Sequence, residues 1–290
     1  MRVVLRRIVN KHFDNSIKKK LKKTEFRFKS FLVRKSPLLT KEHLKTILTE
    51  KFNLREGDNV FCHASLSHIR TNMSEEDILG VIFEVLGEDG SLTVPCYTPI
   101  SSKKYMLSKK KFDVSATRSG MGSFAEYVRK HPKSIRSLHP TKSIASIGLS
   151  SDVLEVDQNN LFPFGKNSPY ERLLDLNVKI IGIGVTMNYL SFVHVGEELD
   201  YDNFPIKVNE DKPYSKLCKG YDGIVREVHT FVHDMDVVVK ANPYSFIKNN
   251  VDNKFWITTR HYFSPFFYIE GKALTQAVLS KANDDITIYN

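Results

Sequence analysis

Four side chains that could carry out acid–base chemistry follow a run of apolar residues in the second half of the chain. Ser191, His194, Glu197 and Glu198 are separated by three, three and one positions, and on a helix the first three would share a face. The imidazole would then lie beside a carboxylate, which is the arrangement of a general base with an orienting acid. The same spacing also fits a histidine that caps or packs a helix start while the acids lie in solvent.

The segment that must position these residues predicts a buried strand beginning near Lys179. Its apolar positions are β-branched, and two glycines interrupt them where another backbone could approach closely. The residues are Ile180, Ile181, Gly182, Ile183, Gly184 and Val185. We therefore expect a central strand whose end delivers the histidine and the carboxylates.

The rest of the chain alternates between strand and helix patterns. Such alternation favours a mostly parallel sheet covered by helices on both faces. Thr40 is the expected N-cap of the first helix of this body, and Ser168 and Pro169 suit the cap and first turn of a later one. The expected helices are 41–52, 74–86, 123–130, 170–176 and 274–282. The expected strands are 59–63, 91–96, 143–149, 225–232 and 235–239, and the segment 262–269 is rich in aromatic residues.

A lysine-rich segment, 101–111, interrupts this alternation. We interpret it as a mobile loop over the sheet edge. Its lysines could be merely solvated, or they could neutralise phosphates of a bound ligand.

The net charge of +10 is concentrated at the N-terminus. Residues 1–36 hold thirteen of the 43 lysines and arginines and two of the 33 acidic residues, which leaves residues 37–290 with a net charge of −1. A basic nucleic-acid-binding face across the body is therefore unsupported. We divide the chain into a basic extension, 1–36, and one catalytic domain, 37–290, a length that can bury a large core.

The extension predicts an amphipathic basic helix, because apolar residues recur every four positions from Leu5 to Leu21. Such a helix could lie on an anionic membrane surface or fold back on the body, and we leave both alternatives open. It lacks the long apolar run of a signal peptide. We expect a cytoplasmic protein, with peripheral attachment to the inner face of the membrane as an additional possibility.

The three cysteines, Cys62, Cys96 and Cys218, are odd in number and have no metal-binding spacing. They argue against a disulfide framework or a zinc site and for a reducing compartment. A covalent route through Cys62 or Cys96 is unattractive, because both lie in apolar strand-like sequence where inert buried thiols are common. We expect no metal cofactor. The sequence does not indicate an oligomeric state.

An ordered series of motifs across residues 44–202 resembles the aminoglycoside 3-N-acetyltransferase family. The most specific part is the run from Arg136 to Ser143, RSLHPTKS, joined to His194 and Glu197 downstream. Three positions depart from the family pattern: Leu190 and Ser191 replace Asn-Thr, and Lys142 stands where a second histidine is usual. The other matching segments are 63–67, 90–95, 117–122, 168–169 and 182–184.

The resemblance implies an α/β/α layered fold around one mixed, largely parallel sheet, and transfer of an acetyl group from acetyl-CoA to a sugar amine. His194 would be the catalytic base, supported by Glu197. His139 and Thr141 would lie where cofactor and acceptor meet, with Thr141 a possible donor to the thioester oxyanion. Residues expected to hold acetyl-CoA are Ser65, Leu66, Ser67 and Ser143, and those expected to contact the acceptor are Glu198, Asp200 and Asp113.

The acceptor is where the sequence is least specific. Aminoglycosides are polycations and would be attracted by an acidic body, whereas this body is electrically balanced. We therefore expect a nucleotide-linked amino sugar used in surface polysaccharide synthesis, with an aminoglycoside antibiotic as the alternative. A second alternative, from another class, is a non-catalytic membrane-peripheral protein in which the basic helix does the binding.

Overall fold

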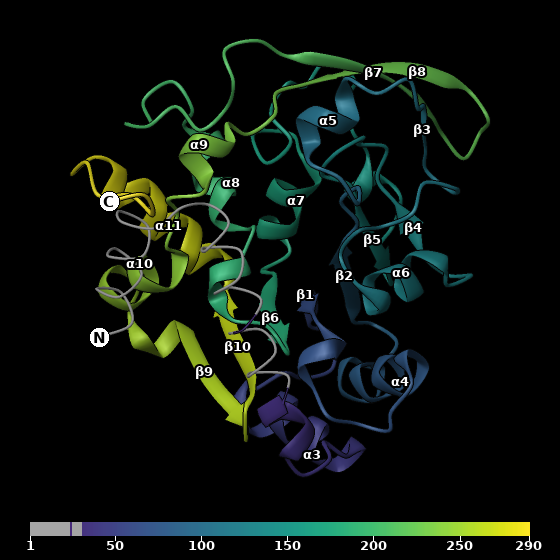
Figure 1. Cartoon of the computed structure of the whole chain (residues 1–290), viewed down its shortest axis with the longest axis vertical. Coiled ribbons are helices and arrows are strands. Elements are labelled where there is room, and N and C mark those ends of the chain that lie inside the picture. The colour runs from purple at the N-terminus through teal and green to yellow at the C-terminus, as the bar shows by residue number, and fades with distance from the viewer. Residues whose placement is uncertain (1–23, 25–30) are drawn as a thin grey trace.

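The computed structural model describes residue 24 and residues 31–290 (Figure 1). The predicted basic helix, and with it most of the 1–36 extension, lies outside the described residues. The part of the extension that is described, from Phe31 to Lys35, is helical and buries Val33. No helix in the described part of the chain is long and apolar enough to cross a membrane.

A seven-stranded mixed sheet forms the centre of the molecule, in the order β4-β5-β2-β1-β6-β10-β9. The expected central strand is confirmed: β6 pairs in parallel with β1, which pairs in parallel with β2. The outer pairings are antiparallel. The bounds are β1 Asn59–Ala64, β2 Ser91–Pro95, β4 Ile135–Arg136, β5 Ile144–Ile147, β6 Lys179–Ile183, β9 Trp256–His261 and β10 Ser264–Glu270.

Helices cover both faces of this sheet, as predicted (Figure 1). Neighbouring side chains on a strand point to opposite faces, and in β1 Cys62 joins one apolar cluster whereas Phe61 joins the other. The first cluster is completed by α3 Lys41–Thr46, α4 Glu75–Leu86 and α6 Ser123–Lys130. The second is completed by α7 Pro169–Asp175, α8 Val193–Leu199, α10 Pro243–Asn250 and α11 Gly271–Ala282.

The predicted helix caps are present. Thr40 accepts a hydrogen bond from the His43 backbone amide, and α3 continues as a π-helical turn, Ile47–Lys51. Ser168 accepts from the Glu171 amide, with Pro169 in the first turn of α7. These interactions are local in sequence, which is why the sequence could predict them.

Two predicted elements are wrong. The segment 101–111 is not simply a loop: it contains α5 Ser102–Met106, in which Tyr105 and Met106 are buried and Tyr105 packs in the apolar cluster of a second sheet. The segment 235–239 is not a strand but α9 Met235–Val238, because Asp234 caps a helical turn there. The second sheet has the order β3-β7-β8, with β3 Phe112–Asp113, β7 Tyr214–Lys219 and β8 Val225–Thr230.

Candidate active site

The chain enters the candidate site where β6 ends. Gly184 has a left-handed backbone (φ 73°), and a Cβ there would lie 2.3 Å from the Ser65 carbonyl oxygen, so only glycine allows this approach. The close backbone approach expected at Gly184 is therefore confirmed, while at Gly182 the neighbour is the Phe267 ring. A short 3₁₀ turn, Met187–Tyr189, then leads into α8.

His194 and Glu197 form a buried pair on one face of α8. Nδ1 of His194 lies 2.7 Å from Oε2 of Glu197, and their side chains are 10% and 0% exposed. Because a carboxylate can only accept, Nδ1 donates to Glu197, and in the neutral imidazole the lone pair is then on Nε2. The predicted neighbourhood of imidazole and carboxylate is thus present, and the alternative with both acids in solvent is excluded.

Glu197 is also close to the C-terminal end of the chain. Burial, together with the nearby charge of Glu197, raises the pKa of Tyr289. The Tyr289 hydroxyl therefore stays protonated near neutrality and is available as a donor toward the carboxylate.

A cavity of about 410 Å³ opens beside His194. It lies beyond the carboxyl ends of β2 and β6, where ligands of open α/β sheets usually bind. Its walls include Tyr97 after β2, Ser191 from the β6–α8 connection, His194 of α8 and Ser102 of α5. The segment predicted as a loop thus supplies a helical wall.

Lys142 reaches this cavity from the turn before β5. Its Nζ lies 4.9 Å from the centre of the Tyr97 ring and 5.6 Å from that of Phe164, which are cation–π distances. The Tyr97 hydroxyl donates to Ser191 Oγ (2.9 Å) and pairs with the Tyr170 hydroxyl (2.9 Å). Burial raises the pKa of Tyr97 to about 12, so it acts here as a neutral donor.

A second histidine, His233, lines the same cavity. Its ring centre lies 4.3 Å from that of His194, and its Nε2 is 3.8 Å from Oε1 of Glu198. Burial, with the charges of His194 and Lys142, lowers the pKa of His233 well below its usual range. No sequence motif indicates this residue, because it lies 39 positions after His194 and is next to it only in the folded structure.

Glu198 does not face the cavity, contrary to its predicted contact with the acceptor. Its carboxyl accepts hydrogen bonds from the Phe164 amide (2.6 Å) and from Asn209 Nδ2 (3.2 Å). Burial raises its pKa to about 8. It is therefore mainly protonated at neutral pH.

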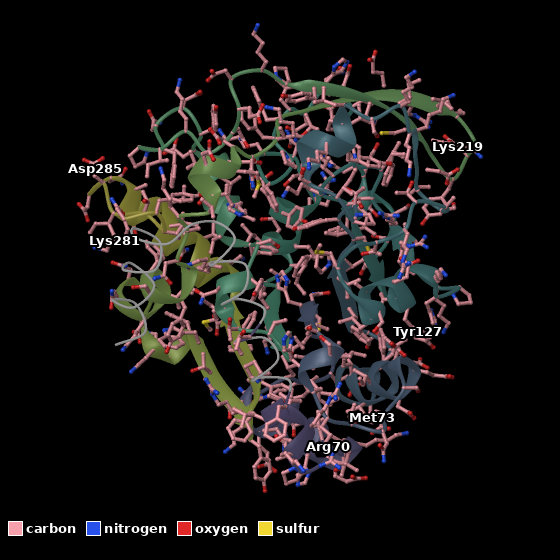
Figure 2. All side chains as sticks on the ribbon, viewed as in Figure 1. Arg70, Met73, Tyr127, Lys219, Lys281 and Asp285 are labelled. Carbon is pink, nitrogen blue, oxygen red and sulfur yellow. The ribbon has the colours of Figure 1, made fainter. Side chains whose placement is uncertain are left out.

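Asp200 and Asp113 also lie away from this cavity. Asp200 lines a separate cavity together with Gln276. Asp113 accepts from the backbone amides at 115 and 116 and pairs with Lys219 (3.5 Å). Figure 2 shows Lys219 at the outer edge of the molecule, on the small sheet. The three acids predicted to contact the acceptor are thus not brought together.

His139 holds the turn that carries Thr141 and Lys142. Its Nδ1 accepts from both of their backbone amides (3.2 and 2.9 Å), and its Nε2 lies 3.2 Å from Thr230 Oγ1. Both ring nitrogens are therefore engaged, so the geometry supports a positioning role instead of direct catalysis. Thr141 is buried, and its Oγ1 has no hydrogen-bond partner among the described residues.

The sequence predicts that Ser143 helps to hold acetyl-CoA, but the hydroxyl of Ser143 is already engaged within the protein. Its Oγ donates to the Cys96 carbonyl (2.9 Å) and accepts from Arg136 Nε (3.0 Å). It therefore fixes the start of β5 against the end of β2.

Ser65, Leu66 and Ser67 follow β1 as predicted and are at least partly accessible. The Ser65 amide donates to the Ile183 carbonyl (2.9 Å), which ties this turn to the end of β6. The three residues do not line the cavity beside His194. Binding of acetyl-CoA by this turn remains a prediction.

The thiols near the site are poor nucleophiles. Burial raises the pKa of Cys96 to about 11 and that of Cys62 further still. Both therefore remain protonated at neutral pH, and a covalent route through them is disfavoured. In the described part of the chain, no group of three or more His, Cys, Asp or Glu side chains is arranged to hold a metal ion.

Comparison with known proteins defines the class. Residues 61–251 match the family model described as aminoglycoside 3-N-acetyltransferase. Aminoglycoside N(3)-acetyltransferase VII of Streptomyces paromomycinus is 25% identical over 65% of this chain and 73% of its own length. Enzyme IX of Micromonospora chalcea is 24% identical over 56% of this chain and 62% of its own length.

Solved structures show the same fold. The AAC-IIIb complex with CoASH superposes with a TM-score of 0.70 at 16% identity, covering 87% of this chain and 98% of that one. Sisomicin-bound AAC-VIa gives 0.68 at 18% identity, with 86% and 99% coverage.

These matches define the class of protein as the N-acetyltransferases. More narrowly, because the family model matches well over half of the chain, the chain belongs to the aminoglycoside 3-N-acetyltransferase family. The predicted family, fold class and type of enzyme are confirmed.

Proposed function

We propose that the protein transfers the acetyl group of acetyl-CoA to an amine of an amino sugar, with His194 as the general base. The observation that carries this proposal is the buried His194–Glu197 pair (2.7 Å) at the edge of a cavity. An amine cannot attack a thioester while it is an ammonium, and an imidazole with a free Nε2 lone pair can accept its proton.

The chain's own residues account for the remaining proton and charge movements. The amine nitrogen forms a bond to the acetyl carbon and gives a proton to Nε2 of His194. The carbon–sulfur bond breaks, and the His194 imidazolium returns that proton to the sulfur, so that CoA leaves as a thiol. Glu197 stabilises the imidazolium that forms at His194. Thr141, whose hydroxyl has no partner among the described residues, is our candidate donor to the developing oxyanion.

The comparisons favour the aminoglycoside acceptor over the nucleotide-linked amino sugar expected from the charge balance. The relatives described above carry the name aminoglycoside N(3)-acetyltransferase. We therefore take the 3-amino group of an aminoglycoside as the first acceptor to test. A role in polysaccharide synthesis has no support among these relatives.

The test is release of CoA thiol during acetyl transfer to a panel of acceptors, including sisomicin and a UDP-linked sugar with a free amine. We expect His194→Ala to lower kcat by about 10²–10⁴-fold, the usual loss on removing a general base. An unchanged rate in this variant would remove His194 from the mechanism. A wild-type chain that neither binds CoA nor acetylates any acceptor would favour the non-catalytic alternative.

A further inference from the structure

The cavity beside His194 has an unusual charge for a site that accepts an amine. Among the described residues that line it, none is Asp or Glu, whereas two are lysines, Lys103 and Lys142. Lys103 is half-exposed at the rim and is already paired with Glu210 (2.9 Å). Of these two lysines, Lys142 is therefore the one that brings an unpaired positive charge to the cavity.

Lys142 has no ion-pair partner and no hydrogen-bond acceptor for its Nζ in the part of the chain that the structure describes. The two aromatic rings beneath it, of Tyr97 and Phe164, stabilise the cation but accept none of its N–H groups as a carboxylate would. The nearby carboxyl of Glu198 is occupied by the Phe164 amide and Asn209. The ammonium thus presents free donors to the cavity.

The charge on Lys142 persists at neutral pH. Burial lowers its pKa to about 8, while the nearby Glu198 opposes that shift. A lysine with this pKa is still mainly protonated at pH 7.

We propose that Lys142 determines the charge of the accepted amino sugar: the substituent next to the reacting amine is neutral or bears an anionic oxygen, and a second ammonium there is disfavoured. This inference rests on the proposed function and deepens it. Like charges in a partly buried site repel strongly, whereas an unpartnered ammonium beside a phosphate or carboxylate gains charge-assisted hydrogen bonds.

The test compares kcat/KM for sisomicin with that for a UDP-linked sugar that carries a free amine, both with acetyl-CoA. The variants are Lys142→Gln, which removes the charge, and Lys142→Glu, which reverses it. The matched control is Lys248→Glu on the exposed side of α10, which changes the net charge equally outside the cavity. Thermal unfolding checks that each variant is folded.

We expect Lys142→Glu to raise the ratio of kcat/KM for sisomicin over the UDP-linked amine at least about tenfold, with Lys142→Gln intermediate and Lys248→Glu unchanged. Ratios that stay equal in all four proteins would overturn the proposal. So would an equal loss of kcat for both acceptors with KM unchanged in Lys142→Gln, because Lys142 would then act on the thioester.

The proposal and the function on which it rests fail in different ways. If the wild type acetylates either acceptor but the ratios do not move, only the role of Lys142 is wrong. If it acetylates neither, the proposed function fails and the inference about Lys142 fails with it.

Discussion

His139 is a buried histidine whose contacts require a neutral ring. Its Nδ1 must keep a lone pair to accept the two amides of the turn, and burial, with the charge of Lys142, lowers its pKa to about 3. In the unfolded chain this histidine has its ordinary pKa of 6.5, so below that pH it binds a proton that it does not bind in the folded chain. Folding stability should therefore fall as the pH drops below about 6.5.

We expect His139→Asn to reduce this acid sensitivity, since an asparagine Oδ1 can replace Nδ1 as the acceptor but does not titrate. Between pH 6.5 and 5.0 the wild type should lose about 2 kcal/mol more unfolding free energy than the variant. Urea denaturation at both pH values measures this difference. His43→Asn, at an exposed histidine, is the control, and an equal acid-dependent loss in wild type and His139→Asn would contradict the prediction.

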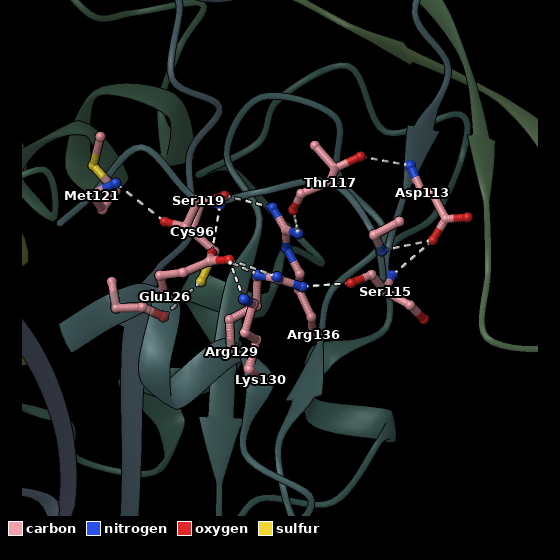
Figure 3. Close-up of polar contacts among 12 residues, drawn as sticks. Cys96, Asp113, Ser115, Thr117, Ser119, Met121, Glu126, Arg129, Lys130 and Arg136 are labelled. Carbon is pink, nitrogen blue, oxygen red and sulfur yellow. Dashed lines mark hydrogen bonds and ion pairs between the residues drawn. The ribbon is translucent and has the colours of Figure 1, made fainter. Parts of the chain in front are cut away.

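At the scale of secondary-structure elements, Arg136 ties three segments to the end of β2. Its guanidinium donates to the carbonyls of Cys96 (2.7 Å) and Thr117 (2.5 Å) and to Ser143 Oγ (3.0 Å). Figure 3 shows it beside the bidentate pair of Arg129 and Glu126 on α6. The buried arginine thus joins β4, β2 and the 113–117 turn through carbonyls that strand pairing leaves unmatched.

We predict that Arg136→Ala lowers the unfolding free energy by at least about 3 kcal/mol, because the Thr117 carbonyl and the Ser143 hydroxyl lose a donor and the Cys96 carbonyl loses one of its two. Arg136→Lys should recover only part of this loss, since an ammonium cannot reproduce the planar fork. Guanidinium chloride denaturation measures both variants. Arg260→Ala, at an exposed arginine of β9, should change stability by less than about 0.5 kcal/mol, and a similarly small effect at Arg136 would refute the assignment.

At the scale of the whole molecule, the charge is divided between a strongly basic extension and a nearly neutral body. We predict that the full chain co-sediments with anionic vesicles at low salt and is released as the salt concentration rises. A version beginning at Phe31 should not bind. It retains the buried Val33 and the bond from Arg70 to the Ser36 carbonyl (2.7 Å), so the comparison leaves the contacts of the described body in place. Equal sedimentation of both versions would show that the extension is not an anchor.

The sequence by itself determined the features that depend on neighbours along the chain. Thr40, Ser168 and Pro169 mark helix starts through contacts within one turn. The pairing of His194 with Glu197 follows from the spacing of an α-helix, in which residues three apart share a face. The central strand could be recognised because a strand buried on both faces reads as a continuous β-branched run. The ordered motifs were sufficient to indicate the family.

Only the tertiary structure decided which charges face the cavity. Glu198 follows Glu197 directly, yet one residue rotates about 100° around a helix, and this turns Glu198 toward Phe164 and Asn209 instead of His194. Lys142 and His233 come from segments far from α8 in sequence, so no local spacing could place them beside His194. The charge of the acceptor site is therefore a property of the fold, because it depends on how separate segments meet beyond the ends of β2 and β6.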